Sequence, residues 1–310
     1  MFHHFHEDGI HTKSQGSISR DDFHKMINFI GRNNILDADI FFEKFKNNKL
    51  KENEVCLTFD DAIKCQIDIA LPVLEEFKIK SFFFVYTSIF EGNPDMLEVF
   101  RYFRMNCFDN VDEFYNNFYK VLDKDLINFF DKNKKIIIEK EERYDFYSYE
   151  DIKFRLVRDS LLTKDEYENN MFKLMKETAI DIENIKLKLF FNKKDLLLLD
   201  KLGHTIGLHS HNHPTKIEKL SYKEQNLEYS TNLSVLNKML NKNSNHIKSC
   251  SHPCGSYNEN SLRILKELGV EIAFKDSMKI EKEKGMTKIN NSFLEIARQD
   301  HSEIFKRMNL

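Results

Sequence analysis

The sequence is poor in residues that break helices. Its 310 residues include no tryptophan, only four prolines and only nine glycines, and none of these prolines or glycines lies between Pro94 and Gly203. Turns between strands normally need proline and glycine, so a long segment without them is expected to be helical. Within it, Thr163 and Glu166 have the spacing of a capping box at a helix start. We therefore predict a helical insertion over residues 91–200.

Cysteines are also few and irregularly spaced. The five cysteines form an odd set without a CxxC motif: Cys56, Cys65, Cys107, Cys250 and Cys254. A disulfide framework or a zinc cluster of cysteines would show a paired, closely spaced pattern. We expect reduced thiols.

Neither sign of charge dominates. The 47 Lys and Arg and 50 Asp and Glu leave a net charge of −3, so no basic field indicates a nucleic-acid partner. No apolar run reaches the ~18 residues that a membrane span needs. Residues 1–10 lack the positive and apolar segments of a secretory signal. These absences favour a cytoplasmic protein without a membrane span, while a hydrophobic fraction of 41% is enough for a folded core.

Short apolar runs alternate with helical stretches on both sides of the insertion. These runs are residues 55–59, 81–86, 204–208, 246–251 and 270–274. Continuous apolar strands separated by helices are typical of a parallel sheet that is covered on both faces. The pattern predicts an α/β domain built from residues 1–90 and 201–310.

Three polar clusters follow predicted strands. They are residues 58–61 (Thr-Phe-Asp-Asp), 209–214 (His-Ser-His-Asn-His-Pro) and 251–257 (Ser-His-Pro-Cys-Gly-Ser-Tyr). Functional sites of parallel α/β folds form at the carboxyl ends of the strands, so the three clusters are expected to meet.

The second cluster indicates a metal site. Two imidazoles and one carboxylate make an open site for a divalent ion, and His209 and His213 lie four residues apart after an apolar strand. Ser210 stands where a zincin has glutamate, so a metalloprotease is not indicated.

Less specific interpretations exist for the neighbouring residues. Adjacent aspartates such as Asp60 and Asp61 are also typical of a solvated turn or a helix N-cap. Cys254 could be a metal ligand, but a small residue that fills a loop is the interpretation we favour. The histidines near the N-terminus also suit a fortuitous chelating tail; they are His3, His4, His6 and His11.

Taken together, the clusters resemble motifs of the polysaccharide deacetylase (NodB-like) family. The matching segments are Thr58-Phe59-Asp60-Asp61, His209-Ser210-x-x-His213-Pro214 and Pro253-x-Gly255, in the family's order. The resemblance covers about residues 1–90 and 203–300. It implies a distorted, incomplete (β/α) barrel, here with a large helical insertion, and metal-dependent hydrolysis of an N-acetyl, or in some members O-acetyl, group on a sugar.

The resemblance also implies residue roles. Asp61, His209 and His213 would hold the metal, with zinc expected first and cobalt, nickel or iron as alternatives. Asp60 would be the general base that takes a proton from the attacking water, and a backbone N–H just after Pro253 would help to stabilise the oxyanion. Adjacent strand residues point to opposite faces, so both aspartates reach one site only if the strand turns at Asp60.

Two positions depart from the family pattern. Ser251 stands where the third motif usually begins with an arginine that orients the base, and Arg298, in a late Arg-x-Asp element, is predicted to substitute for it. The family's late motif, which supplies the acid histidine, is not evident in this sequence. The start Met1-Phe2-His3 resembles the Met-Tyr-His start of rearranged family members, so His3 is the predicted general acid. His4 is the second candidate and His301 the third.

We therefore expect a metal-dependent hydrolase that removes an N-acetyl group from an amino sugar in a glycan or activated sugar precursor, for surface polysaccharide biosynthesis. The alternatives are a non-sugar C–N amide hydrolase of the same fold and, because Ser251 replaces the arginine, an inactive carbohydrate-binding protein. The insertion is interpreted as a lid over the site, a contact within a homo-oligomer, or a solvated helical addition.

Overall fold

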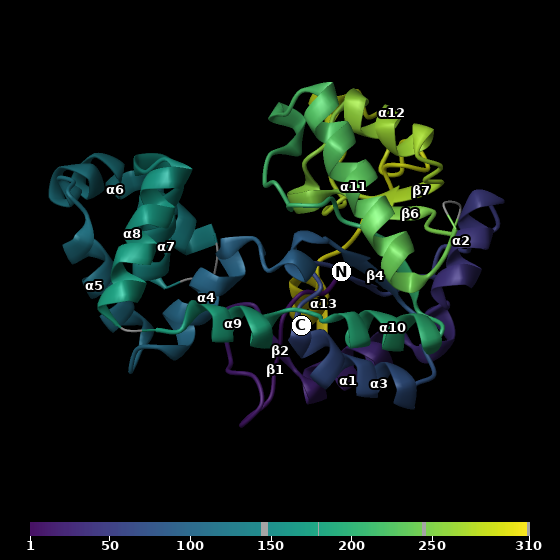
Figure 1. Ribbon diagram of the computed structural model, residues 1–310, viewed down its shortest axis with the longest axis horizontal. Coiled ribbons are helices and arrows are strands. Elements are labelled where there is room, and N and C mark those ends of the chain that lie inside the picture. Colours follow the sequence, from purple (N-terminus) through teal and green to yellow (C-terminus); the bar gives the residue numbers. More distant parts are fainter. Residues whose placement is uncertain (144–147, 179, 244–245, 309–310) are drawn as a thin grey trace. The chain divides into compact units, whose positions relative to one another are not determined.

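The computed structural model describes residues 1–143, 148–178, 180–243 and 246–308, and the chain divides into two compact units (Figure 1). The first unit comprises Met1–Glu7, Ser17–Asp95 and Lys188–Leu310, and the second comprises Asp8–Gly16 and Met96–Leu187. These bounds differ from the expected insertion of residues 91–200, because α10 (Lys193–Lys201) packs against β5 and α11 of the first unit. A lack of glycine and proline marks a helix, but it does not tell which core the helix packs on.

The first unit is built on a parallel sheet of five strands in the order β3-β4-β5-β6-β7. The strands are β3 (Thr58–Phe59), β4 (Phe82–Val85), β5 (Thr205–Leu208), β6 (Ser249–Ser251) and β7 (Ile272–Phe274). Every pair is parallel, as the sequence predicts, although each strand is shorter than its apolar run. A separate pair, β1 (Phe5–His6) and β2 (Ile18–Ser19), is also parallel.

Both faces of the sheet are buried, which explains the continuous apolar runs. In β4, Phe83 and Val85 pack in one hydrophobic cluster, whereas Phe82 and Phe84 pack in another together with Phe274. The second cluster also includes Ala38 and Phe41 of α2 (Ala38–Lys46).

Additional parallel bridges extend the sheet at each edge. Phe2 pairs with Phe59 of β3, and Ile296 pairs with Phe274 of β7. The two edges are linked in turn, since the His301 N–H donates to the Met1 carbonyl at 3.1 Å. Segments near residues 1 and 301 therefore lie next to each other and join the two edges of the curled sheet.

Helices cover the sheet, and several begin at capping boxes. Ser221 and Glu224 form one at the start of α11 (Tyr222–Leu240), and Asn258 caps α12 (Glu259–Glu267). The remaining α-helices of this unit are α1 (Arg20–Ile30), α3 (Leu71–Glu76) and α13 (His301–Met308). The short helices are η1 (Arg32–Asn34), η2 (Gln66–Ala70), η3 (Ser88–Glu91), η5 (Ile217–Lys219), η6 (Pro253–Gly255) and η7 (Lys282–Lys284). In Figure 1, α11 and α12 lie beside β6 and β7.

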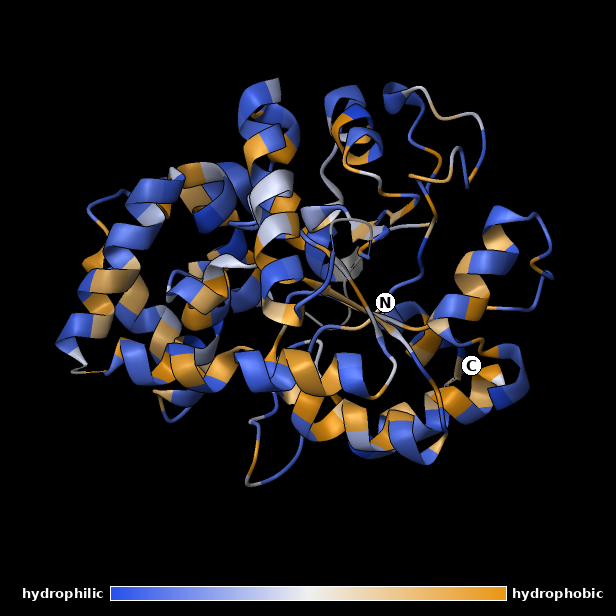
Figure 2. Ribbon diagram, turned by 45° about the vertical axis from the view of Figure 1, so that its right-hand side comes forward, coloured by the Kyte–Doolittle hydropathy of each residue, from blue (hydrophilic) through white to orange (hydrophobic). Residues whose placement is uncertain are grey.

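The second unit is helical. Thr163 and Glu166 form the predicted capping box at the start of α8 (Lys164–Glu177). The other helices are α4 (Met96–Asn106), α5 (Val111–Val121), α6 (Leu126–Arg143), α7 (Tyr149–Leu156), η4 (Val157–Leu161) and α9 (Ile182–Leu189). Figure 2 shows both hydrophobic and hydrophilic residues on these helices, and in α8 the residues Tyr167, Met171, Leu174 and Met175 form the buried face.

Two further expectations concern the described residues. All five cysteines lie among them and none forms a disulfide, which agrees with the predicted reduced thiols. None of the described helices combines the length and the apolar character needed to span a membrane.

Candidate active site

The candidate site residues come from the carboxyl ends of neighbouring strands. Asp60 and Asp61 follow β3, His209 follows β5, and Ser251 ends β6. Arg298 comes shortly after Ile296, which pairs with β7 at the opposite edge of the sheet from β3. The predicted convergence of the polar clusters is thus produced by the parallel sheet and its closure.

A tight turn after β3 brings both aspartates into the site. Asp61 has a φ of 73° and Ala62 a φ of 52°, a left-handed conformation that is uncommon for residues other than glycine and is often retained at functional sites. The buried Gln66, at the start of the π-helix η2, fixes this turn, because its Nε2 donates to the carbonyls of Asp60 at 2.6 Å and His3 at 3.0 Å. The condition that the strand turns at Asp60 is therefore met.

Three side chains form a group that suits a metal ion. The ligand atoms of Asp61, His209 and His213 all lie within 4.8 Å of one another. The Nε2 atoms of His209 and His213 lie 3.0 and 3.3 Å from Asp61 Oδ1. His211, between the two histidines in the sequence, instead contacts the hydroxyl of Thr87 at 2.9 Å.

The second nitrogen of each of these histidines already has a partner. His209 Nδ1 lies 2.8 Å from the Ser251 carbonyl, an acceptor only, so Nδ1 carries a hydrogen and Nε2 is the nitrogen that faces Asp61. His213 Nδ1 lies 3.0 Å from Asp95 Oδ2. Such outer contacts orient histidine ligands and raise their basicity. The donor set thus fits a divalent ion held by two imidazoles and a carboxylate.

Asp60 is held by a different set of groups. Arg298 donates to both oxygens of Asp60, from Nη1 at 2.8 Å and from Nη2 at 2.7 Å. Its other N–H groups reach Ser251 Oγ at 2.7 Å, Thr58 Oγ1 at 3.2 Å and the Lys275 carbonyl at 2.7 Å. The five hydrogen bonds match the five donors of a guanidinium. Ser251 Oγ also lies 2.9 Å from Asp60 Oδ2. Arg298 therefore orients Asp60 together with Ser251, the residue that stands where the family pattern has an arginine.

Charged neighbours lower the pKa values of both aspartates against the effect of burial. Burial alone would raise the pKa of Asp60, but the charges of Arg298 and His209 hold that pKa well below its usual range. Burial likewise opposes ionisation of Asp61, while His213 and His209 keep the pKa of Asp61 well below its usual range. Both carboxylates are therefore ionised at neutral pH.

The three candidate acid histidines lie in different surroundings. His3 Nε2 lies 3.9 Å from Asp61 Oδ2, and a quarter of the His3 side chain is exposed. His4 stacks on His3 with ring centroids 6.1 Å apart. His301 is buried against Phe2 and lies 3.6 Å from Asp300. His3 thus has a side-chain contact to the metal group, and its role as the acid stays a prediction. Cys254 is not part of the metal group.

Two residues of the site were missed by the sequence-based prediction. Asp95 precedes α4 in a segment that the sequence assigns to the insertion, and Gln66 lies in a stretch read as an ordinary helix. The pair Pro94-Asp95 at the end of a glycine-containing loop is a weak signal of a turn, and nothing in it indicates a contact with a histidine more than 100 residues away.

Comparisons with known proteins concern the family and the fold. A model of the family described as polysaccharide deacetylase matches residues 47–102 and 162–273, which is more than half of the chain. No curated protein matches the chain.

Solved structures share the fold at low sequence identity. The Streptococcus pyogenes deacetylase PplD in complex with acetate has a TM-score of 0.55 and 15% identity, over 96% of this chain and 88% of that one. A de-N-acetylase from Aggregatibacter actinomycetemcomitans has a TM-score of 0.55 and 13% identity, over 99% and 97% of the two chains. IcaB from Ammonifex degensii has a TM-score of 0.53 and 12% identity, over 99% and 93%.

These similarities confirm the predicted fold, a curled, incomplete barrel of parallel strands with a helical insertion. The family match spans the segments that carry the aspartate pair, the two histidines and the Pro253-x-Gly255 motif. The chain belongs to the polysaccharide deacetylase family.

Proposed function

We propose that the chain is a metal-dependent hydrolase that removes an N-acetyl group from an amino sugar, in a glycan or an activated sugar precursor used for surface polysaccharide. The observation that carries this proposal is the group of Asp61, His209 and His213, whose ligand atoms lie within 4.8 Å of one another. Beside it, Asp60 is bound by Arg298 and does not belong to the group. One carboxylate at the metal and a second, independently oriented one are what metal-assisted hydrolysis requires.

Each residue has a defined task in this proposal. A bound divalent ion, zinc first and cobalt, nickel or iron otherwise, would acidify a water and polarise the acetyl carbonyl. Asp60, kept ionised by Arg298, takes the proton of the attacking water. His3 gives a proton to the departing amine. The backbone N–H of Cys254, directly after Pro253, is the proposed additional donor to the oxyanion.

The alternative of an inactive carbohydrate-binding protein was based on Ser251 in place of an arginine. Arg298 contacts both Asp60 and Ser251, so the absence of an arginine at position 251 no longer favours that alternative. A non-sugar amide hydrolase would use the same side chains and differs only in substrate. The cytoplasmic location and a homo-oligomer formed through the insertion stay predictions.

The test combines metal content with acetate release. The protein, loaded in turn with each metal, is incubated with N-acetylglucosamine oligomers, and acetate and free amine are measured. Asp60→Asn should keep the metal and lose acetate release by about 10²–10⁴-fold, the usual contribution of a general base. Asp61→Asn should lose both metal and activity. Asp39→Asn, at an exposed position in the first turn of α2, is the matched control and should lose neither.

The outcomes separate the readings. Activity that survives complete metal removal, or full metal content in Asp61→Asn, would contradict the metal-dependent mechanism. Acetate release from a simple N-alkylacetamide but not from acetylated sugars would favour the non-sugar hydrolase. Glycan binding without release of acetate from any acetylated sugar would favour the binding protein.

A further inference from the structure

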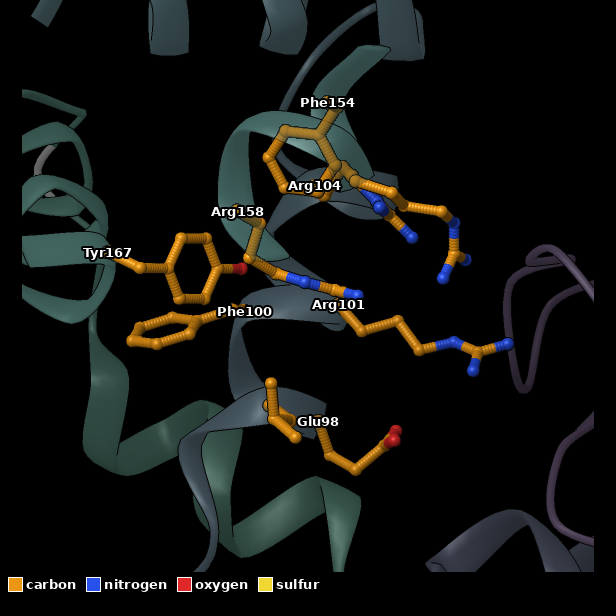
Figure 3. A pocket seen from close by; sticks show the side chains of 9 residues that line it. Glu98, Phe100, Arg101, Arg104, Phe154, Arg158 and Tyr167 are labelled. Carbon is orange, nitrogen blue, oxygen red and sulfur yellow. The ribbon is translucent and has the colours of Figure 1, made fainter. Parts of the chain in front are cut away.

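The second unit contains a cavity lined by four arginines, which we call the arginine pocket. Its volume is about 170 Å³, and the lining side chains come from α4, α7, η4 and α8. Arg101, Arg104, Arg155 and Arg158 face a single lining carboxylate, Glu98. Figure 3 shows guanidinium groups gathered on one side of this pocket and the rings of Phe100 and Tyr167 on the other.

Three of the four arginines have contacts of their own. Arg101 donates to Ser14 Oγ at 3.1 Å and to the Gln15 carbonyl, and Arg155 donates to Gln15 Oε1 at 2.9 Å. The acceptor groups in these three contacts are neutral. Arg158 contacts Asp159 at 2.6 and 3.0 Å, although a quarter of its side chain stays exposed.

Arg104 differs from the other three. It is 7% exposed, and its buried Nε has no hydrogen-bond partner. Within the described residues, its guanidinium makes neither a hydrogen bond nor an ion pair, and its contact is with the ring of Phe154, 5.3 Å from the centroid. A buried cation is costly unless it is paired and hydrogen-bonded. A side chain of this kind, aimed into a cavity among three other guanidinium groups, lacks an anion.

We propose that the arginine pocket binds a phosphate or diphosphate group, with Arg104 as its central contact. A phosphate carries about −1.5 to −2 charges at neutral pH, which suits a pocket lined by four guanidinium groups in which the buried Nε of Arg104 has no hydrogen-bond partner. Guanidinium binds phosphate bidentately and is preferred for this purpose over lysine. Burial raises the pKa of Tyr167 to about 12, so its phenol stays neutral and can donate to the same anion.

The size of the pocket limits what enters it. Pockets for drug-sized ligands have about 300–1,000 Å³, so a cavity of about 170 Å³ suits the phosphate part of a ligand and not a whole nucleotide. The phosphate can be free or belong to a larger molecule, and inorganic pyrophosphate and a nucleoside diphosphate distinguish these sources. The inference uses side chains of the second unit alone and does not depend on the proposed deacetylase function.

The test is titration calorimetry of the full chain with inorganic pyrophosphate and with uridine diphosphate, at constant ionic strength. We expect binding of both probes to wild type. Arg104→Met should weaken it by about tenfold or more, the usual effect of losing a charged hydrogen bond. Arg158→Gln, at a partly exposed position where folding is not at risk, should weaken it severalfold. Lys135→Gln removes the same charge from a side chain that is 90% exposed and should change it by less than twofold.

Thermal unfolding without ligand separates binding from a structural role. Removal of an unpaired buried cation should leave the melting temperature of Arg104→Met equal to or above that of wild type, while the upward shift produced by pyrophosphate is lost. Tighter binding of uridine diphosphate than of pyrophosphate would identify the phosphate as part of a larger ligand. The proposal is overturned if neither probe binds, if sulfate at the same ionic strength gives the same shift, or if Arg104→Met and Arg158→Gln bind like Lys135→Gln.

Discussion

The ion pair between Arg298 and Asp60 allows a quantitative prediction. Both side chains are almost fully buried, at 4% and 3% exposure, and their closest atoms are 2.7 Å apart. Replacement of one member of such a pair leaves the other charge buried without compensation, which costs about 3–5 kcal/mol of stability. We therefore expect Arg298→Met to lower the free energy of unfolding by that amount at pH 7.

The pH dependence of stability should change sign at the same time. In wild type the pKa of Asp60 is depressed, so Asp60 contributes stability that is present above its unfolded pKa of about 3.9 and is lost as the pH falls below it. Without Arg298, burial dominates and raises the pKa of Asp60. The folded state then binds the extra proton, and Arg298→Met should lose stability as the pH rises from about 4.

Urea unfolding followed by circular dichroism measures both effects, and a chelator removes the contribution of metal binding. Arg298→Met/Asp60→Asn should recover part of the loss, because the uncompensated charge is gone. Arg263→Met is the control, since Arg263 is 70% exposed beside Glu267 and should change stability by less than about 0.5 kcal/mol. A loss below about 1 kcal/mol in Arg298→Met, or a double variant no more stable than the single one, would refute the reasoning.

Three other perturbations follow from local contacts. Asp95→Asn removes the carboxylate 3.0 Å from His213 Nδ1 and should weaken metal affinity about 10–100-fold, measured by chelator competition; an unchanged affinity would contradict its role. Burial lowers the pKa of His204 to about 4. The contribution of neutral His204 to the free energy of unfolding is complete above its unfolded pKa of about 6.5 and should fall by about 3 kcal/mol as the pH is lowered towards 4. Urea unfolding at pH 7 and 4 should show a weaker decline in His204→Asn. Gly207→Ala places a Cβ 2.5 Å from the Phe84 ring and should cost about 1–3 kcal/mol in thermal unfolding, with partial recovery on adding Phe84→Leu.

The sequence was informative where a motif is local. Asp60, Asp61, His209 and His213 lie in short segments after apolar strands, and these local motifs together with the family resemblance named them. The structure groups Asp61, His209 and His213. Arg298 was named from a resemblance to a late element, yet its contact depends on how the two edges of the sheet are linked through residues 1 and 301. Chain closure of this kind leaves no periodic pattern in the sequence.

The unpredicted parts are those that depend on packing alone. The bounds of the two units follow the core on which each helix packs, so α10 belongs with β5 although it lies in the segment without glycine or proline. The contact of Asp95 with His213 joins residues 118 positions apart. The sequence lists these side chains, but it carries no local signal for the long-range contacts that decide their partners.

The adjacent aspartates show most clearly how position decides chemistry. Asp60 lies among Arg298, Ser251 and Thr58, whereas Asp61, one residue later in a left-handed turn, contacts His209 and His213. Two carboxylates with identical intrinsic acidity are thereby placed in different surroundings, one opposite a guanidinium and one opposite two imidazoles. Arg298 binds both oxygens of Asp60, whereas Asp61 Oδ1 lies beside both imidazoles, so Asp61 is the carboxylate placed to hold a metal. The division into base and ligand thus follows from the turn at Asp61 and the closure that delivers Arg298.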